Sequence, residues 1–232
     1  LRLGEFERNS LVVFAITMIA NVLSYLYQIV MGNVLTPADY GTVNTLLSLS
    51  VVVGVPSGII SALTATYTAK YHAHGETFAI AAFMHGMLRV AAVLAAIVFV
   101  AGALLSRPIA HVLQIDDPHY VTVVMVLVAS NCLGPIFSST LQGVKRFIPY
   151  SMNSVLSFAF RLLLGVIFVW LGRGIPGALA ALILAACLTM LYCLFKSRDL
   201  FFAPVKEKLA LDRTEIRRYF VSTFWFQLFL LL

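Results

Sequence analysis

Charged residues are scarce in this sequence. They make up 11% of the 232 residues, while hydrophobic residues make up 61%, against about 45–50% in an ordinary soluble domain. This composition excludes a soluble enzyme and a soluble nucleic-acid-binding domain, although the net charge of +6 taken alone would favour nucleic acid as a partner. We therefore expect a protein that crosses the bilayer several times, with membrane lipids and no nucleic acid around it.

Cysteine is also sparse, and its placement indicates neither a disulfide framework nor a metal site. Cys132, Cys187 and Cys193 all fall in or at the edge of long apolar runs, so they form no zinc-binding pattern. His72 and His74 make an H-x-H pair in a polar loop, but the sequence offers no third ligand beside them. No metal and no cofactor is expected.

Acidic residues are missing from the interior of every long apolar run. A helix needs roughly 20 apolar residues to cross the bilayer core, and the long apolar runs of this chain reach about that length. The predicted fold is therefore an all-α polytopic membrane helix bundle. Coupling to sodium or protons normally needs a carboxylate within the membrane, and these runs offer none. The six predicted spans are about Ser10–Met31, Tyr40–Ala69, Phe83–Leu105, Tyr120–Gln142, Phe147–Leu171 and Pro176–Leu194.

The six spans form a predicted six-helix N-terminal lobe over residues 1–195. A cytoplasmic basic linker over 196–218 follows, and the apolar run over 219–232 is interpreted as the start of a seventh helix. The chain is thus expected to be one lobe of a two-lobed transporter, cut within a helix. Twelve of the 16 Lys and Arg residues lie on the side of the N-terminus and the linker, against two on the other side. The positive-inside rule then places the N-terminus in the cytoplasm.

Proline and glycine predict departures from straight helices. The second span contains a ridge of small residues with Pro56 inside it, which predicts a kink. The fourth span is expected to be interrupted around Pro135. Between the third and fourth spans, the piece Pro108–Ile115 is predicted to form a short interfacial helix.

Two arginines lie where lipid-facing apolar residues would be expected. Arg161 sits near the middle of the fifth span, where an arginine costs about 2.5–3.5 kcal/mol on insertion, and it shares a helix face with Ser154 and Ser157. Arg89 lies in the third span, one turn after His85. Because no acidic residue inside a span neutralises them, we expect an anionic ligand to supply the negative charge.

Uncharged polar residues inside the spans complete the predicted substrate site. Their amides suit hydrogen bonds to sugar hydroxyls, but bonds between helices, worth about 0.6 kcal/mol on average in membranes, explain them equally well. Arg161 could likewise bind helix carbonyls, and Arg89 could reach the headgroups. No catalytic residue is assigned. The candidate substrate-binding residues are Arg161, Arg89, Asn21, Gln28, Asn131 and Asn153.

Three short motifs carry a family resemblance. The turn Leu35–Gly41, with the sequence LTPADYG, resembles the L-x-P-x-[DE]-[YF]-G turn of the polysaccharide transport family, which includes the oligosaccharide and O-antigen flippases. Leu141–Phe147 and Gly174–Ala178 are similar to segments of that family in the same order. The family belongs to the multidrug/oligosaccharidyl-lipid/polysaccharide (MOP) flippase superfamily.

The resemblance implies a fold, an activity and a set of partners. Members of the family have two six-helix lobes around a central cavity. They move lipid-linked oligosaccharides, carried on polyprenyl pyrophosphate, across the inner (cytoplasmic) membrane by alternating access. The implied role is in polysaccharide or lipopolysaccharide O-antigen biosynthesis, without enzymatic activity. The implied partners are a lipid-linked oligosaccharide, membrane lipids and polysaccharide assembly proteins.

Two other functions stay open at this stage. The first is a multidrug or cation antiporter of the same superfamily, which the missing intramembrane carboxylate disfavours. The second is a membrane-embedded glycosyltransferase or polymerase, whose chemistry needs carboxylates or a base near the sugar. Its candidate residues would be Asp116, Asp117 and His119, in the loop between the third and fourth spans.

Overall fold

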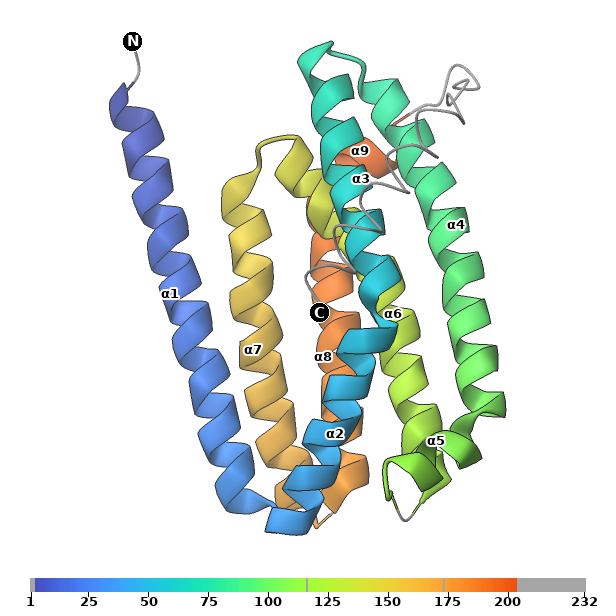
Figure 1. Cartoon of the computed structure of the whole chain (residues 1–232). Coiled ribbons are helices and arrows are strands. Elements are labelled where there is room, and N and C mark those ends of the chain that lie inside the picture. The colour runs from blue at the N-terminus through green and yellow to red at the C-terminus, as the bar shows by residue number, and fades with distance from the viewer. Residues whose placement is uncertain (1–2, 116, 173, 204–232) are drawn as a thin grey trace.

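The computed structural model describes residues 3–115, 117–172 and 174–203, and all regular structure in these ranges is helical (Figure 1). Five of the described helices are long and apolar enough to cross a membrane, and the bent pair α2–α3 makes a sixth if the two helices are counted as one span. The predicted helical membrane bundle is therefore confirmed, while the predicted seventh helix lies outside the described residues. The elements are α1 (Leu3–Val34), α2 (Pro37–Val53), α3 (Val55–Ala73), α4 (Thr77–Leu104), α5 (Ser106–Val112), α6 (Pro118–Gly143), α7 (Phe147–Trp170), α8 (Gly174–Lys196) and α9 (Arg198–Phe201).

The long helices pack in an order that differs from their order in the chain. α1 lies against α7, α7 against α8, α8 against α6, and α6 against both α3 and α4 (Figure 1). Lipid tails are as apolar as leucine, so close packing and hydrogen bonds hold such helices together. α6 has the most neighbours of the spans in this arrangement. Its fully buried side chains include Val121, Val128, Ile136, Thr140 and Leu141.

The second predicted span is bent, as Pro56 indicated. α2 and α3 meet at Gly54 with an angle of 50°, and Pro56 occupies the first turn of α3, where a missing N–H removes no helical hydrogen bond. A Cβ at Gly54 would lie 2.7 Å from the carbonyl oxygen of Ser50. The predicted kink is thus confirmed, and glycine allows the close approach of backbone at the break.

α6 runs from Pro118 to Gly143 as one helix, so the predicted interruption at Pro135 is wrong. Pro135 lies inside the helix, and because it has no N–H, the carbonyl of Asn131 loses its usual helical donor. The hydroxyl of Ser138 donates to the Pro135 carbonyl at 3.3 Å. The helix continues through this position while packed against α3, α4 and α8. The short helix predicted between the third and fourth spans is α5.

The short helix α9 connects two parts of the lobe at one end. Arg146, just before α7, pairs with Asp199 through both carboxylate oxygens, and its Nη1 also donates to the Lys196 carbonyl at 3.0 Å. The ring of His85 on α4 stacks on Phe201, with ring centres 4.4 Å apart. α9 therefore ties the turn between α6 and α7 to α4, at the end where α1 begins (Figure 1).

Replacing Asp199 with asparagine is expected to make the stability of the fold less sensitive to acid. The hydrogen bond from Arg146 lowers the pKa of Asp199. The pair therefore stabilises the fold above the ordinary aspartate pKa of about 3.9, and this contribution disappears as the pH falls through the lowered value. The side chains are 40% and 51% exposed, which limits the contribution to below about 1 kcal/mol.

Thermal unfolding of the full-length protein between about pH 5 and pH 2.5 measures this effect. The wild-type protein should lose more stability over that interval than the Asp199→Asn variant. Parallel curves for the two proteins would contradict the assignment of the pair.

Candidate functional site

Three cavities meet at one side chain, that of Arg161 on α7. The first has a volume of about 150 Å³ and lies between α6, α7 and α8. The second, of about 520 Å³, lies between the α2–α3 break, α6 and α8. The third, of about 350 Å³, lies between α1, α2 and α7. Because Arg161 lines all three, we call them together the Arg161 cavities.

The guanidinium group of Arg161 has no anionic partner among the described residues. Its Nε is buried and lacks a hydrogen-bond acceptor in this part of the chain. Its Cζ lies 5.5 Å from the centre of the Phe158 ring, one turn earlier on the same helix. Such a cation–π contact, worth about 0.5–2 kcal/mol, holds the side chain without neutralising it. Because a charge that is partly shielded from solvent is costly to leave unpaired, the free donors of this half-buried guanidinium are available to bind an anion.

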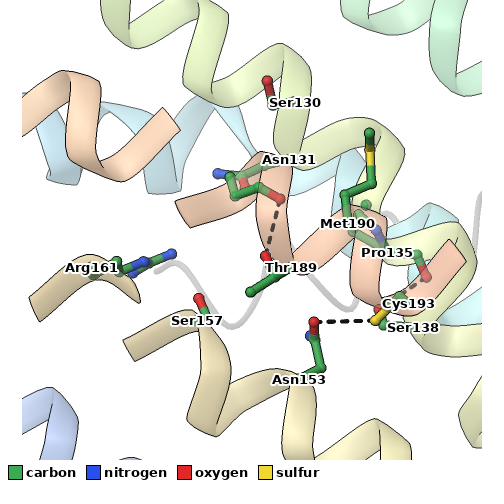
Figure 2. Close-up of a pocket in the computed structure, with 12 residues that line it drawn as sticks. Ser130, Asn131, Pro135, Ser138, Asn153, Ser157, Arg161, Thr189, Met190 and Cys193 are labelled. Carbon is green, nitrogen blue, oxygen red and sulfur yellow. Dashed lines mark hydrogen bonds between the residues drawn. The ribbon is translucent and has the colours of Figure 1, made fainter. Parts of the chain in front are cut away.

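Polar side chains from three helices face the first cavity (Figure 2). Asn131 comes from α6, Asn153 and Ser157 from α7, and Thr189 from α8. The thiol of Cys193 donates to Oδ1 of Asn153 at 3.1 Å, and the Thr189 hydroxyl donates to the backbone of α8 at 2.8 Å. Asn131 and Ser157 form no side-chain hydrogen bond within the described ranges, so their polar groups can bond a ligand.

The other two cavities extend this polar surface. In the third cavity, Ser24, Tyr27 and Gln28 lie together on one face of α1 and line the same space as Arg161. In the second cavity, Pro135 and its neighbours on α6 face the break between α2 and α3. The two departures from regular helix, a bend and an internal proline, therefore border the same space.

The structure brings together four of the six predicted site residues. Asn131, Asn153 and Gln28 line the cavities that Arg161 joins. Asn21 and Arg89 line none of the three, and both are exposed. Arg89 belongs to α4, which contributes no residue to these cavities. The two arginines thus do not share a cavity in the described lobe, and the roles of Arg89 and Asn21 stay predictions.

On α7 the polar face differs from the predicted one by one residue. Ser157 and Arg161 line the first cavity as expected, but Asn153 lies there in place of Ser154, which is exposed. Both sets follow helical spacing, so Asn153 was among the candidates, but its place on the same face as Ser157 and Arg161 was not predicted. The sequence analysis also missed Tyr27, which lies directly before the candidate Gln28 and lines the third cavity with it.

Solved transporters share this fold at low sequence identity. A multidrug resistance MATE family transporter of the MOP superfamily in an outward-facing conformation is 18% identical, with a TM-score of 0.69 over 94% of this chain and 52% of that chain. A MATE in complex with Br-NRF is 18% identical, with a TM-score of 0.69 over 92% and 52%.

A third solved structure is a MOP superfamily transporter from Pyrococcus furiosus Vc1 (DSM3638), for which the reverse polarity of the binding pocket suggests a different function. It is 20% identical, with a TM-score of 0.65 over 94% of this chain and 52% of that chain. This chain therefore spans about half the length of the solved transporters that it matches. At these identities the likeness establishes the fold alone.

The family of the chain follows from its sequence as a whole. No curated protein matches it significantly, but the family described as polysaccharide biosynthesis protein matches residues 6–232. The matched folds are those of multi-pass membrane proteins, in agreement with the several apolar spans predicted from the sequence. The chain belongs to the polysaccharide biosynthesis protein family.

Proposed function

We propose that the chain forms one lobe of a flippase that moves an oligosaccharide linked to polyprenyl pyrophosphate across the cytoplasmic membrane by alternating access. The observation that carries this function is Arg161, a half-buried cation whose Nε is buried and which has no counter-charge among the described residues, at the meeting point of three cavities. A cargo that is both anionic and rich in hydroxyl groups suits this site. Its phosphates supply the missing charge, and its hydroxyls bond the surrounding amides.

The four candidate residues that line the Arg161 cavities each have a proposed role toward this cargo. Arg161 binds the pyrophosphate, because its planar guanidinium can donate to two phosphate oxygens at once. Its Nε, which has no acceptor within the described residues, is one of the available donors. Asn131 and Asn153 from the first cavity and Gln28 from the third hydrogen-bond the sugar.

Arg89 and Asn21 have smaller proposed roles. Both are exposed and lie outside the Arg161 cavities. The exposed surface of one lobe in a two-lobed transporter borders lipid or the other lobe. Arg89 therefore contacts cargo only if its side of α4 borders the passage between lobes, and its removal should impair transport less than removal of Arg161.

A drug or cation antiporter suits the fold but not the charge of this site. The matched multidrug transporters are 18% identical and support the fold alone. Coupling to sodium or protons normally uses a carboxylate within the membrane, and the described spans hold no Asp or Glu beyond their first turns. Arg161 would in addition repel a cationic drug.

A membrane-embedded glycosyltransferase has little support in the loop before α6. The carboxylate of Asp117 caps α6 and accepts a hydrogen bond from the backbone N–H of His119 at 2.9 Å. That interaction is an ordinary helix cap. Asp116 lies outside the described residues.

The proposed organisation follows from the distribution of basic residues. Residues 1–195 are proposed as the N-terminal lobe, 196–218 as a cytoplasmic linker and 219–232 as part of a seventh helix, in the inner membrane. The larger share of Lys and Arg on the side of the N-terminus supports this orientation. Polysaccharide assembly proteins are proposed as further partners.

Cysteine labelling in intact cells tests this orientation. In a full-length protein without its native cysteines, a cysteine at Arg173 should react with a membrane-impermeant maleimide, while one at Lys208 should react only after the membrane is opened. Reaction of both positions in intact cells would contradict the six-span topology.

Surface polysaccharide export by cells that carry full-length Arg161 variants tests the flippase function. If the proposal is right, lipid-linked oligosaccharide accumulates on the cytoplasmic side while surface polysaccharide falls. Export at the wild-type level, with a wild-type amount of protein, would overturn the anionic-cargo site.

A further inference from the structure

An apolar groove lies between α7 and α8, on a different face from the Arg161 cavities. Its volume is about 860 Å³, within the range of roughly 300–1,000 Å³ that is typical of ligand sites. α7 contributes Met152, Leu156 and Phe160, each one residue before a residue that lines the first cavity. Since successive helical residues are about 100° apart, α7 presents a polar face to the cavities and an apolar face to the groove.

α8 divides in the same way. Thr189 and Cys193 line the first cavity, whereas Leu188, Leu191 and Phe195 line the groove and are exposed. The groove is therefore open along the outside of the helix pair. In a membrane, a hydrocarbon chain can enter it from the side.

One end of the groove carries a positive charge. Arg198 of α9 lines this end and is exposed, and its Cζ lies 4.6 Å from the centre of the Phe195 ring. Asp199 is the one acidic residue in the sequence from 174 to 203, and it is bound by Arg146. It does not neutralise Arg198, so among the described residues the apolar groove ends at a cation without an anionic partner.

We propose that this groove binds an anionic phospholipid, with its phosphate at Arg198 and one acyl chain along the groove. A guanidinium group can donate to two phosphate oxygens at once. Lys196 adds a second positive charge near the groove, with its Nζ 6.0 Å from the centre of the ring of Tyr192, which lines the groove. Aromatic and basic residues of this kind are typical of the membrane interface.

The charge at the end of the groove favours this occupant over bulk lipid. Any exposed apolar helix face touches lipid tails without regard to the headgroup, whereas a cation fixed at the mouth of a groove selects for headgroup charge. This end of the lobe also holds Lys145 and Arg146, on the side with most of the basic residues. That side faces the anionic leaflet if the proposed orientation is right.

Native mass spectrometry of the full-length protein, with phosphatidylglycerol or phosphatidylcholine added, tests the site. The wild-type protein is expected to bind phosphatidylglycerol more tightly. The affinity of the Arg198→Gln variant for phosphatidylglycerol should be about five-fold lower, because one basic residue contributes about 1 kcal/mol to binding at an anionic membrane surface. Its affinity for phosphatidylcholine should not change. Lys145→Gln, which removes an exposed charge at the same end but outside the groove, should bind both lipids as the wild type does.

Other results would overturn the lipid site. Equal affinity of the wild type for the two lipids would do so, as would unchanged binding of phosphatidylglycerol by Arg198→Gln. Leu191→Trp, which fills the groove and keeps the cation, should also weaken phosphatidylglycerol binding. A disulfide between Leu191→Cys and Phe224→Cys, or between two copies of Leu191→Cys, would show that protein occupies the groove instead of lipid.

Discussion

Replacing Arg161 with alanine in the full-length protein is expected to lower export of surface polysaccharide by roughly 30-fold or more. Removing one partner of a buried, hydrogen-bonded charge pair costs about 2–5 kcal/mol, and about 2 kcal/mol corresponds to roughly 30-fold in binding. The pair in question is the Arg161 guanidinium and the pyrophosphate of the cargo. Export per molecule of protein in the membrane is the quantity to measure.

A lysine at this position separates the charge from the shape of the side chain. Lysine keeps a positive charge but lacks the planar fork, so export by Arg161→Lys should lie between that of the wild type and that of Arg161→Ala. Thermal stability should change much less than function. Because the Nε of Arg161 has no partner within the described residues, removing this cation loses its contact with the Phe158 ring but also removes an unpaired charge that is costly to shield from solvent, whereas loss of an arginine hydrogen-bonded within the fold would lower stability clearly.

Arg89→Ala is the matched control for this experiment. It removes the same charge from a spanning helix, but at an exposed position outside the Arg161 cavities. Its effect on export should be clearly smaller. Equal losses of export in Arg161→Ala and Arg89→Ala would mean that a position in the Arg161 cavities gives an arginine no special role in transport. That result would contradict the proposed site.

Replacing Gly143 with alanine is expected to destabilise the lobe by about 1–3 kcal/mol, and larger residues should do more damage. A Cβ at this position would lie 2.8 Å from the carbonyl oxygen of Ala65 and 2.8 Å from the Cβ of Thr68. Neither atom is the end of a flexible side chain, so α3 and α6 would have to move apart. The melting temperature and the yield of monodisperse full-length protein report this effect.

Gly134→Ala is the control on the same helix. Nothing lies within 4 Å of a Cβ at Gly134, and alanine favours helix over glycine by about 1 kcal/mol. This variant should be as stable as the wild type or more so. A melting temperature of Gly143→Ala that matches that of Gly134→Ala would show that α3 and α6 do not approach as closely as described.

The spans and the bend were open to prediction because their signals are local. An apolar run without charge marks a span by its length, and Pro56 disfavours a straight helix around the break at Gly54. The same local reasoning failed at Pro135, where α6 continues. There, packing against neighbouring helices on several sides outweighs the lost hydrogen bond, which the sequence of one helix does not reveal.

The candidate site was open to prediction in part. Arg161 stood out because a charge in a span has a high cost whatever surrounds it. The choice of Asn153 over Ser154, and the separation of Arg89 from Arg161, depended on how the helices pack. Periodicity groups residues on one helix face, but it does not say which face meets which neighbour.

The sequence by itself determined that this protein is a helical membrane protein, where its spans lie and that one of them carries an arginine in its middle. These properties depend on the transfer of each segment from water to lipid, which is a sum over its own residues. The tertiary structure alone decided that α1, α2, α6, α7 and α8 converge on Arg161 and that α4 does not. In lipid, apolar faces pack against lipid and against protein with nearly equal ease, so the pairing of helices depends on shape complementarity between residues far apart in the chain.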